Sequence, residues 1–225
     1  MSDDKTPYDD LIKEYRDITN NHKKIVEGIL EKLKEADITI KDNLVESNVC
    51  FILSCPGECK LRENKVCAGQ TGENLEGIIK KLRVYCKSVF PNDDRYSYNI
   101  VNASQKVHFQ ALNGKTEDDN DVIASEDNIK RIADVIRKQK IKYVILCGKK
   151  AKLLDSCIKD IGDVKIAYVE HLGLQGINKQ IKCDIDGQDI ISLPKTDRTD
   201  ARLEVIADSI CKQLNKNQCL KGLSC

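Results

Sequence analysis

The spacing of apolar residues predicts a chain in which β-strands and helices alternate. Short apolar runs bounded by turn residues predict four strands, at 48–54, 98–104, 142–147 and 165–170. Apolar residues spaced three or four apart predict five helices, at 8–36, 75–90, 125–139, 151–161 and 199–214. Near the C-terminus, an Asp-Gly pair within the segment 181–191 has the pattern of a hairpin.

Strands alternating with helices of this length predict an α/β fold, a three-layer α/β/α sandwich around a central, mostly parallel four-stranded sheet. N-terminal helices and a C-terminal hairpin and helix complete the prediction. We expect one domain over residues 1–225, since about 70% of the unfolded surface is buried at this size. Its parts are an N-terminal helical segment (1–45), a core that carries the motifs (46–178), and the C-terminal hairpin and helix (179–225).

The composition is that of a globular chain, with 40% hydrophobic and 32% charged residues. The longest apolar runs, Val49–Leu53 and Tyr143–Cys147, are far shorter than the roughly 20 residues that a membrane helix needs. The first twenty residues are rich in Asp and Glu, where a signal peptide would be basic and then apolar. We therefore expect a cytoplasmic protein with no membrane partner.

The eleven cysteines are an odd number, and several lie inside apolar runs, which favours free thiols. The chain has no C-x-x-C pair, so neither a zinc ribbon nor a thioredoxin-type pair is indicated. Cys55, Cys59 and Cys67 are close in sequence and could join Cys86 around an iron–sulfur cluster, but their spacing matches no standard ligand pattern. We expect no cofactor and no metal, and the cluster stays an open alternative.

The net charge of +1 gives no general attraction to a polyanion, but the charge is uneven. Residues 129–159 contain ten Lys or Arg and only two Asp. Lys149, Lys150 and Lys152 follow the third predicted strand, at the start of a predicted helix.

In a parallel sheet, ligands bind at the loops that leave the carboxyl ends of the strands. The four such loops are 54–72, 102–109, 148–152 and 171–178. The first contains a Pro-Gly turn and a Gly-x-x-Gly sequence, and the last starts with a histidine followed by a glycine-rich stretch. These features place the candidate site at the carboxyl edge of the sheet.

Together the loops resemble the motifs of the uracil-DNA glycosylase superfamily over residues 49–178. The matching elements are Cys55-Pro56-Gly57 after a buried strand, Gly69-Gln70-Thr71-Gly72 before a helix, Asn102 on the second strand, Gly148-Lys149-Lys150-Ala151 after the third, and His171 after the fourth. The resemblance implies that Asn102 pairs with a base flipped out of DNA and that His171 stabilises the departing base. It also implies that the loop after His171 wedges the duplex, through Leu172 or Leu174, with Asn178 at its end. Because Lys149, Lys150 and Lys152 lie beside this pocket, we predict that they contact DNA phosphates.

Several residues depart from the family pattern. Ser54 and Cys55 stand where the family has a carboxylate or amide that positions water, and Glu58 is the nearest carboxylate. Cys67 replaces an aromatic residue that stacks on the base, which opens the pocket. We therefore expect Glu58 to stabilise the sugar cation and the pocket to accept a bulky, modified base. The remaining base-binding residues implied are Cys55, Gly57, Cys67 and Gln70.

Three hypotheses of different classes follow. The first is a DNA glycosylase that acts as a monomer on a damaged or hypermodified base, in repair or in antiviral defence, and leaves an abasic site. The second is a catalytically silent relative that binds nucleic acid or a nucleotide in the same pocket. The third is an unrelated α/β domain that binds a phosphorylated ligand, although the chain has neither a P-loop nor a G-x-G-x-x-G sequence.

Overall fold

The computed structural model describes residues 11, 14, 23–36, 38–63 and 65–219. Its centre is an all-parallel, four-stranded sheet in the order β2-β1-β3-β4. The strands are β1 (Val49–Leu53), β2 (Asn99–Asn102), β3 (Tyr143–Cys147) and β4 (Lys165–Val169). All four lie within the predicted strand ranges, and the sheet is wholly rather than mostly parallel.

The strands read as continuous apolar runs because both faces of the sheet are covered. Every residue of β1 is buried. Val49, Phe51 and Leu53 belong to the apolar cluster on one face, whereas Cys50 and Ile52 belong to the cluster on the other. The alternation places the two helical layers of the predicted α/β/α sandwich on opposite sides of the sheet.

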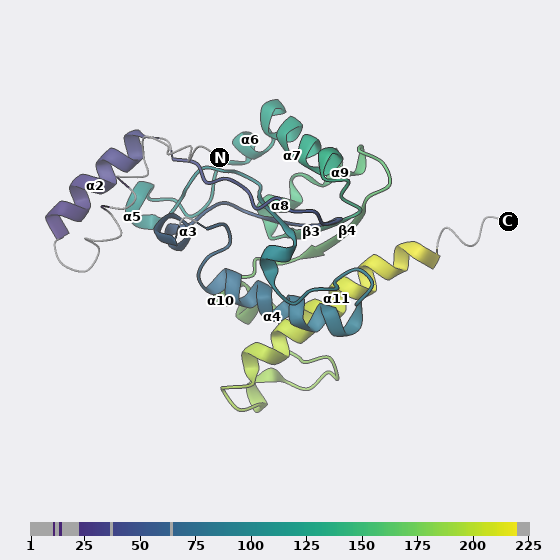
Figure 1. The fold of residues 1–225 in the computed structure, drawn as a ribbon. Coiled ribbons are helices and arrows are strands. Elements are labelled where there is room, and N and C mark those ends of the chain that lie inside the picture. Colours follow the sequence, from purple (N-terminus) through teal and green to yellow (C-terminus); the bar gives the residue numbers. More distant parts are fainter. Residues whose placement is uncertain (1–10, 12–13, 15–22, 37, 64, 220–225) are drawn as a thin grey trace.

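One layer consists of α4 (Gln70–Tyr85) and α11 (Arg198–Cys219), which pack against each other, with α10 (Leu174–Gln180) beside them. The opposite layer contains α7 (Glu126–Lys138) and the short helices α8 (Lys149–Lys152) and α9 (Asp155–Lys159). Figure 1 shows the two layers on either side of the sheet. The predicted three-layer sandwich is confirmed.

Other elements surround this core. Helix α2 (Lys23–Glu35) packs against α5 (Gln110–Asn113), and α3 (Glu58–Glu63) follows β1. Further short elements are η1 (Arg95–Ser97), α6 (Asn120–Ile123) and η2 (Ile190–Ser192). Apolar residues of α2, α3 and α5 form a third buried cluster beside the sheet. Among the described residues, no helix is both long enough and apolar enough to cross a membrane.

Two predicted elements differ in the structure. The predicted helix 151–161 is two short helices, because tight bonds such as Leu154 N to Ala151 O end α8 after one turn. The predicted hairpin at 181–191 is a turn closed by a single bridge, Cys183 to Asp189, without strands. The Asp184 carboxylate accepts hydrogen bonds from the backbone N–H groups of Asp186 and Gln188, and these bonds stabilise the turn.

The N-terminal segment 1–45 is helical only in part. Most of residues 1–22 lie outside the described residues, and α2 ends at Glu35. Residues after it are extended and make antiparallel bridges along the β2 edge, between Thr39 and Lys106 and between Asn43 and Ile100. The edge strand β2 therefore gains backbone partners that apolar periodicity alone does not indicate.

Candidate functional site

A cleft of about 710 Å³ lies at the carboxyl edge of the sheet, where the loops after β1, β2 and β4 meet. The strand order places the topological switch point between β1 and β3, and this is where α/β sheets bind ligands. The side chains that line the cleft and carry chemistry are Ser54, Cys55, Glu58, Lys60, Gln70, His108, Glu117 and His171. The structure therefore has a cleft at the predicted location of the site.

His171 follows β4 and forms part of the cleft wall. Its Nδ1 accepts a hydrogen bond of 3.0 Å from the backbone N–H of Gly173. Desolvation and the nearby Lys60 charge lower the pKa of His171, although Glu117 acts in the opposite direction. A neutral imidazole whose Nδ1 accepts must carry its proton on Nε2. The ring therefore offers an Nε2–H donor.

Two glycines after His171 let the loop fold back on the imidazole. A Cβ at Gly173 would lie 2.9 Å from His171 Nδ1, and one at Gly176 would lie 2.3 Å from the His171 carbonyl oxygen. The glycine-rich sequence after His171 is thus required for close packing around the ring. The same turn starts α10, whose first residue, Leu174, also lines the cleft.

Asn74 holds the His171 loop against the core. Asn74 is buried on α4, and its Nδ2 donates a 2.6 Å hydrogen bond to the carbonyl of Leu172. Gln70 Nε2 donates in turn to Asn74 Oδ1 at 3.2 Å. The Leu172 side chain is 1% exposed and packs in the α4–α11 cluster. Of the two predicted wedge residues, only Leu174, at 37% exposure, lies on the surface.

The floor of the cleft holds a buried lysine. Lys60, on α3, is 5% exposed, and its Nζ donates to Asn102 Oδ1 at 2.8 Å and to the Cys55 carbonyl at 3.2 Å. Burial lowers the pKa of Lys60, against the attraction of neighbouring groups that include Asp42. Asn102 is fully buried and lies behind Lys60 rather than on the cleft surface.

Several buried polar atoms at the site lack a hydrogen-bond partner within the part of the chain that the structure describes. They are Ser54 Oγ, Asn102 Nδ2 and His108 Nε2. His108 Nε2 is 3.3 Å from Asp118 Oδ1, but outside hydrogen-bond geometry. An unsatisfied buried polar group costs about 1–3 kcal/mol, so such a cluster is typical of a site that a ligand or water completes. Ser54 and His108 both line the cleft.

Six of the predicted site residues meet in the cleft, and the others lie elsewhere. The six are Cys55, Gly57, Glu58, Gln70, His171 and Leu174. Cys67 is fully buried in the α4–α11 cluster with a φ of 56°, so its thiol packs in the core. Asn178 lies further along α10, where its carbonyl accepts from Lys182.

The three lysines predicted to contact DNA lie on α8, directly after β3. Lys150 Nζ donates to Asn120 Oδ1 at 2.7 Å, and Lys152 Nζ pairs with Glu170 Oε1 at 2.9 Å. Hydrogen bonding from Lys152 lowers the pKa of Glu170. Lys149 is exposed beside them. The group adjoins the His171 loop, but α8 is too short for the dipole of a long helix to add to its charge.

Sequence analysis missed Lys60, Asn74 and His108. The sequence holds one signal for Asn74, because the apolar pattern of α4 places this residue on the buried face of the helix. Neither Lys60 nor His108 differs in sequence context from a surface residue. Contacts with residues from other loops position His108. Its backbone N–H donates to the Pro56 carbonyl, and its ring Nδ1 lies 2.8 Å from Asn113 Nδ2.

The structure does not bring the four central cysteines together. Cys55 and Cys59 line the cleft, whereas Cys86 is buried beside Cys211, whose pKa it raises in addition to burial. Over the described residues, no group of three or more His, Cys, Asp or Glu side chains is arranged to hold a metal ion. The nine cysteines from Cys50 to Cys211 are free thiols.

Comparison of the chain with protein-family models and with curated protein sequences finds no match.

Proposed function

We propose that this protein is a DNA glycosylase that receives a flipped base in the cleft and hydrolyses its N-glycosidic bond. The observation that carries the proposal is His171 on the wall of a cleft at the carboxyl edge of the sheet, where its Nδ1 accepts from the Gly173 N–H. This bond and a lowered pKa favour the neutral ring with Nε2–H as a donor. The motifs that place it resemble those of the uracil-DNA glycosylase superfamily. The layered sheet has the architecture that this resemblance implies.

The chemistry uses groups that line the cleft. As the C1′–N bond breaks, its electron pair goes to the base, and His171 Nε2–H donates a hydrogen bond to the developing anion. The sugar becomes an oxocarbenium-like cation, which the Glu58 carboxylate stabilises. Water then adds to C1′, and the proton it loses passes through solvent to the base anion, which leaves an abasic site and the free neutral base. Such a reaction does not require the strong base that Ser54 and Cys55 have replaced.

The cleft leaves room for a modified base. Its volume of about 710 Å³ lies within the range of sites for whole small molecules. Glu58, Gln70 and Glu117 bring polar groups to its wall, which suits a polar substituent on the base. We therefore propose that the substrate is a bulky, modified base.

A panel of DNAs tests the function directly. Oligonucleotides with normal, deaminated or hypermodified bases are incubated with the protein, and abasic sites are cleaved with alkali. We expect strand cleavage for at least one modified base. Binding to the same DNAs without any cleavage would overturn the glycosylase and leave the silent binder of nucleic acid or nucleotide.

Lys149→Ala should weaken binding to all DNA sequences to a similar degree, because a phosphate contact carries no sequence information. The slope of log K against log salt should fall by about one per lost contact. The matched control is Lys138→Ala: Lys138 ends α7, which leads into the amino end of β3, at the opposite edge of the sheet. A salt slope equal to that of the control would remove Lys149 from the DNA footprint.

Leu174→Ala should impair release from duplex DNA much more than from single strands, because an exposed apolar side chain beside the cleft can fill the gap left by the flipped nucleotide. Leu44→Ala is the matched control, since Leu44 is similarly exposed, at 44%, and does not line this cleft. Equal losses on duplex and single-stranded substrates would assign Leu174 a folding role instead.

A further inference from the structure

One edge of the sheet is formed by β4, which ends the strand order β2-β1-β3-β4. In a parallel strand pair, the backbone groups of alternate residues point toward the neighbouring strand, and those of the residues between them point away. The N–H of Lys165 and the carbonyl of Val169 bond to residues at the two ends of β3. Ile166 and Tyr168 therefore present their backbone groups outward. An uncovered edge of this kind is a template for a strand of another chain.

A side chain of α11 closes the centre of the β4 edge. Gln213 Oε1 accepts a 2.8 Å hydrogen bond from the Tyr168 N–H, and Gln213 Nε2 donates to the Tyr168 carbonyl at 3.0 Å. The same Nε2 donates to Ser209 Oγ at 3.1 Å, one turn back along α11, and this bond holds the amide in place. A carboxamide has the donor and the acceptor of a peptide group. Gln213 therefore takes the place of a residue in a neighbouring strand.

The opposite edge of the sheet is closed by the chain itself. By the same alternation, Ile100 and Asn102 are the residues of β2 that face outward. Ile100 exchanges two backbone hydrogen bonds of 2.9 Å with Asn43. The Asn102 N–H donates to Asp42, and its carbonyl accepts from Arg131. The outward backbone groups of β2 are thus satisfied, and β4 is the edge at which a second chain could add.

We propose that Gln213 keeps the chain from pairing with a second copy of itself through β4. Without the Gln213 amide, the outward groups of Tyr168 would be as open as those of Ile166, which have no such partner in the described part of the chain. Two copies related by a twofold axis would satisfy these groups by antiparallel pairing of β4 with β4. Because the β2 edge is closed, association should stop at the dimer. Pairing of this kind depends on the sheet and not on the reaction in the cleft.

Gln213→Met tests the proposal, because methionine is similar to glutamine in length but lacks the amide donor and acceptor. The apparent mass of the folded variant should rise toward twice that of the wild type as its concentration increases, as measured by size-exclusion chromatography with light scattering. Lys212→Met is the matched control, since it adds the same apolar side chain at the preceding, exposed position of α11, where Lys212 pairs with Asp208. The control should elute like the wild type.

Hydrogen exchange locates the contact and also tests the wild type. After correction for intrinsic rates, the Tyr168 N–H of the wild type should exchange about threefold to tenfold more slowly than the Ile166 N–H, because Gln213 accepts from the former alone. Both amides should be protected in the Gln213→Met dimer. Should Gln213→Met not fold, the wild-type comparison still decides. A folded Gln213→Met that stays monomeric, a dimer with an unprotected Ile166 N–H, or equal exchange of the two amides in the wild type would overturn the proposal.

Discussion

His171→Ala should slow base release by about 10²–10³-fold while DNA affinity and folding stay nearly unchanged. The size follows from the loss of one preorganised donor to a developing anion. The fold should tolerate the change because the imidazole lines the cleft and accepts a hydrogen bond from its neighbour in sequence, Gly173. Single-turnover rates and DNA binding, measured side by side, separate the two effects.

A conservative variant distinguishes the donor from the rest of the ring. His171→Gln keeps an N–H group and should recover part of the lost rate. In the wild type, NMR of the imidazole nitrogens should show the neutral Nε2–H tautomer, since Nδ1 accepts from Gly173. Release by His171→Ala at the wild-type rate, or a dominant Nδ1–H tautomer, would contradict the role of His171.

The lowered pKa of His171 predicts how base release depends on acid. Desolvation lowers the pKa of His171 from its usual value of 6.5, so the neutral imidazole persists to lower pH than that of an ordinary histidine. Protonation would place an Nδ1–H against the N–H of Gly173 and turn the ring. The rate should therefore decline in acid, with a midpoint below pH 6.5. If the rate of His171→Gln fell in acid in the same way as the wild-type rate, a group other than His171 would cause the pH dependence.

Much of the fold could be predicted because a sheet covered on both faces leaves a clear signal. The strands are continuous apolar runs, and their alternation with long amphipathic helices favours a parallel sheet. The same topology sends every strand's carboxyl end to one edge, so His171, Glu58 and Gln70 could be expected to lie together before any contact was known. The break between α8 and α9 could not, since local 3₁₀-type bonding decides it.

The interior of the site could not be predicted, because the burial of a polar side chain is a tertiary property. Lys60 has the sequence context of a surface charge, yet α3 directs it under the cleft. Leu172 and Leu174 are similar in sequence, since both adjoin Gly173, but Asn74 holds the backbone of Leu172 against the core and Leu174 lies outside it. Apolar periodicity does not distinguish such neighbours in a loop.

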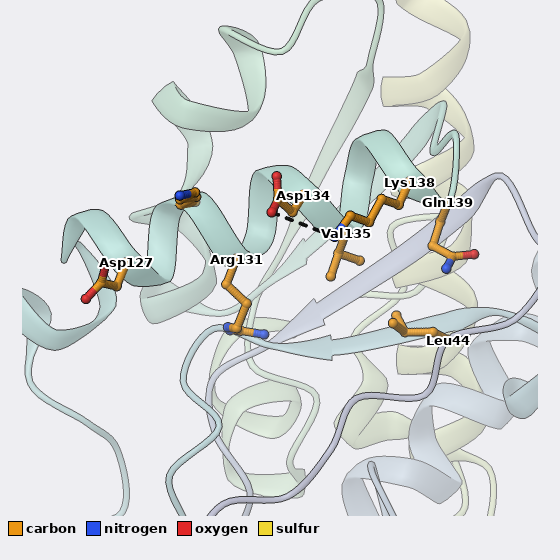
Figure 2. A pocket seen from close by; sticks show the side chains of 8 residues that line it. Leu44, Asp127, Arg131, Asp134, Val135, Lys138 and Gln139 are labelled. Atoms are coloured by element: carbon orange, nitrogen blue, oxygen red, sulfur yellow. Dashed lines mark ion pairs between the residues drawn. The ribbon is translucent and has the colours of Figure 1, made fainter.

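Asp42→Ala should lower the free energy of unfolding by about 3–5 kcal/mol, the cost of leaving one member of a buried ion pair alone. Asp42 Oδ2 is 2.7 Å from Arg131 Nη1, and the two side chains are 5% and 22% exposed. Burial raises the pKa of Asp42 and lowers that of Arg131, each opposed by the attraction of the other. Figure 2 shows Arg131 reaching from α7 toward the strands.

The matched control lies one turn along the same helix. Asp134 and Lys138 pair at 3.9 Å on the surface, beside a shallow pocket of about 430 Å³ (Figure 2), so Asp134→Ala should cost no more than about 0.5 kcal/mol. Chemical denaturation of both variants measures the difference. Equal losses would show that Arg131 finds water when Asp42 is removed.

The Asp42–Arg131 pair also connects stability to the site. Asp42 accepts from the Asn102 N–H at 2.9 Å, and Arg131 Nη2 donates to the Asn102 carbonyl at 2.7 Å. Together they hold the end of β2, where the Asn102 side chain accepts a hydrogen bond from Lys60. The double variant Asp42→Leu with Arg131→Met removes both charges, so it should regain much of the stability that Asp42→Ala loses. Because the clamp on Asn102 stays broken, base release by the double variant should stay slower than in the wild type, which would separate the pair's part in folding from its part in the site.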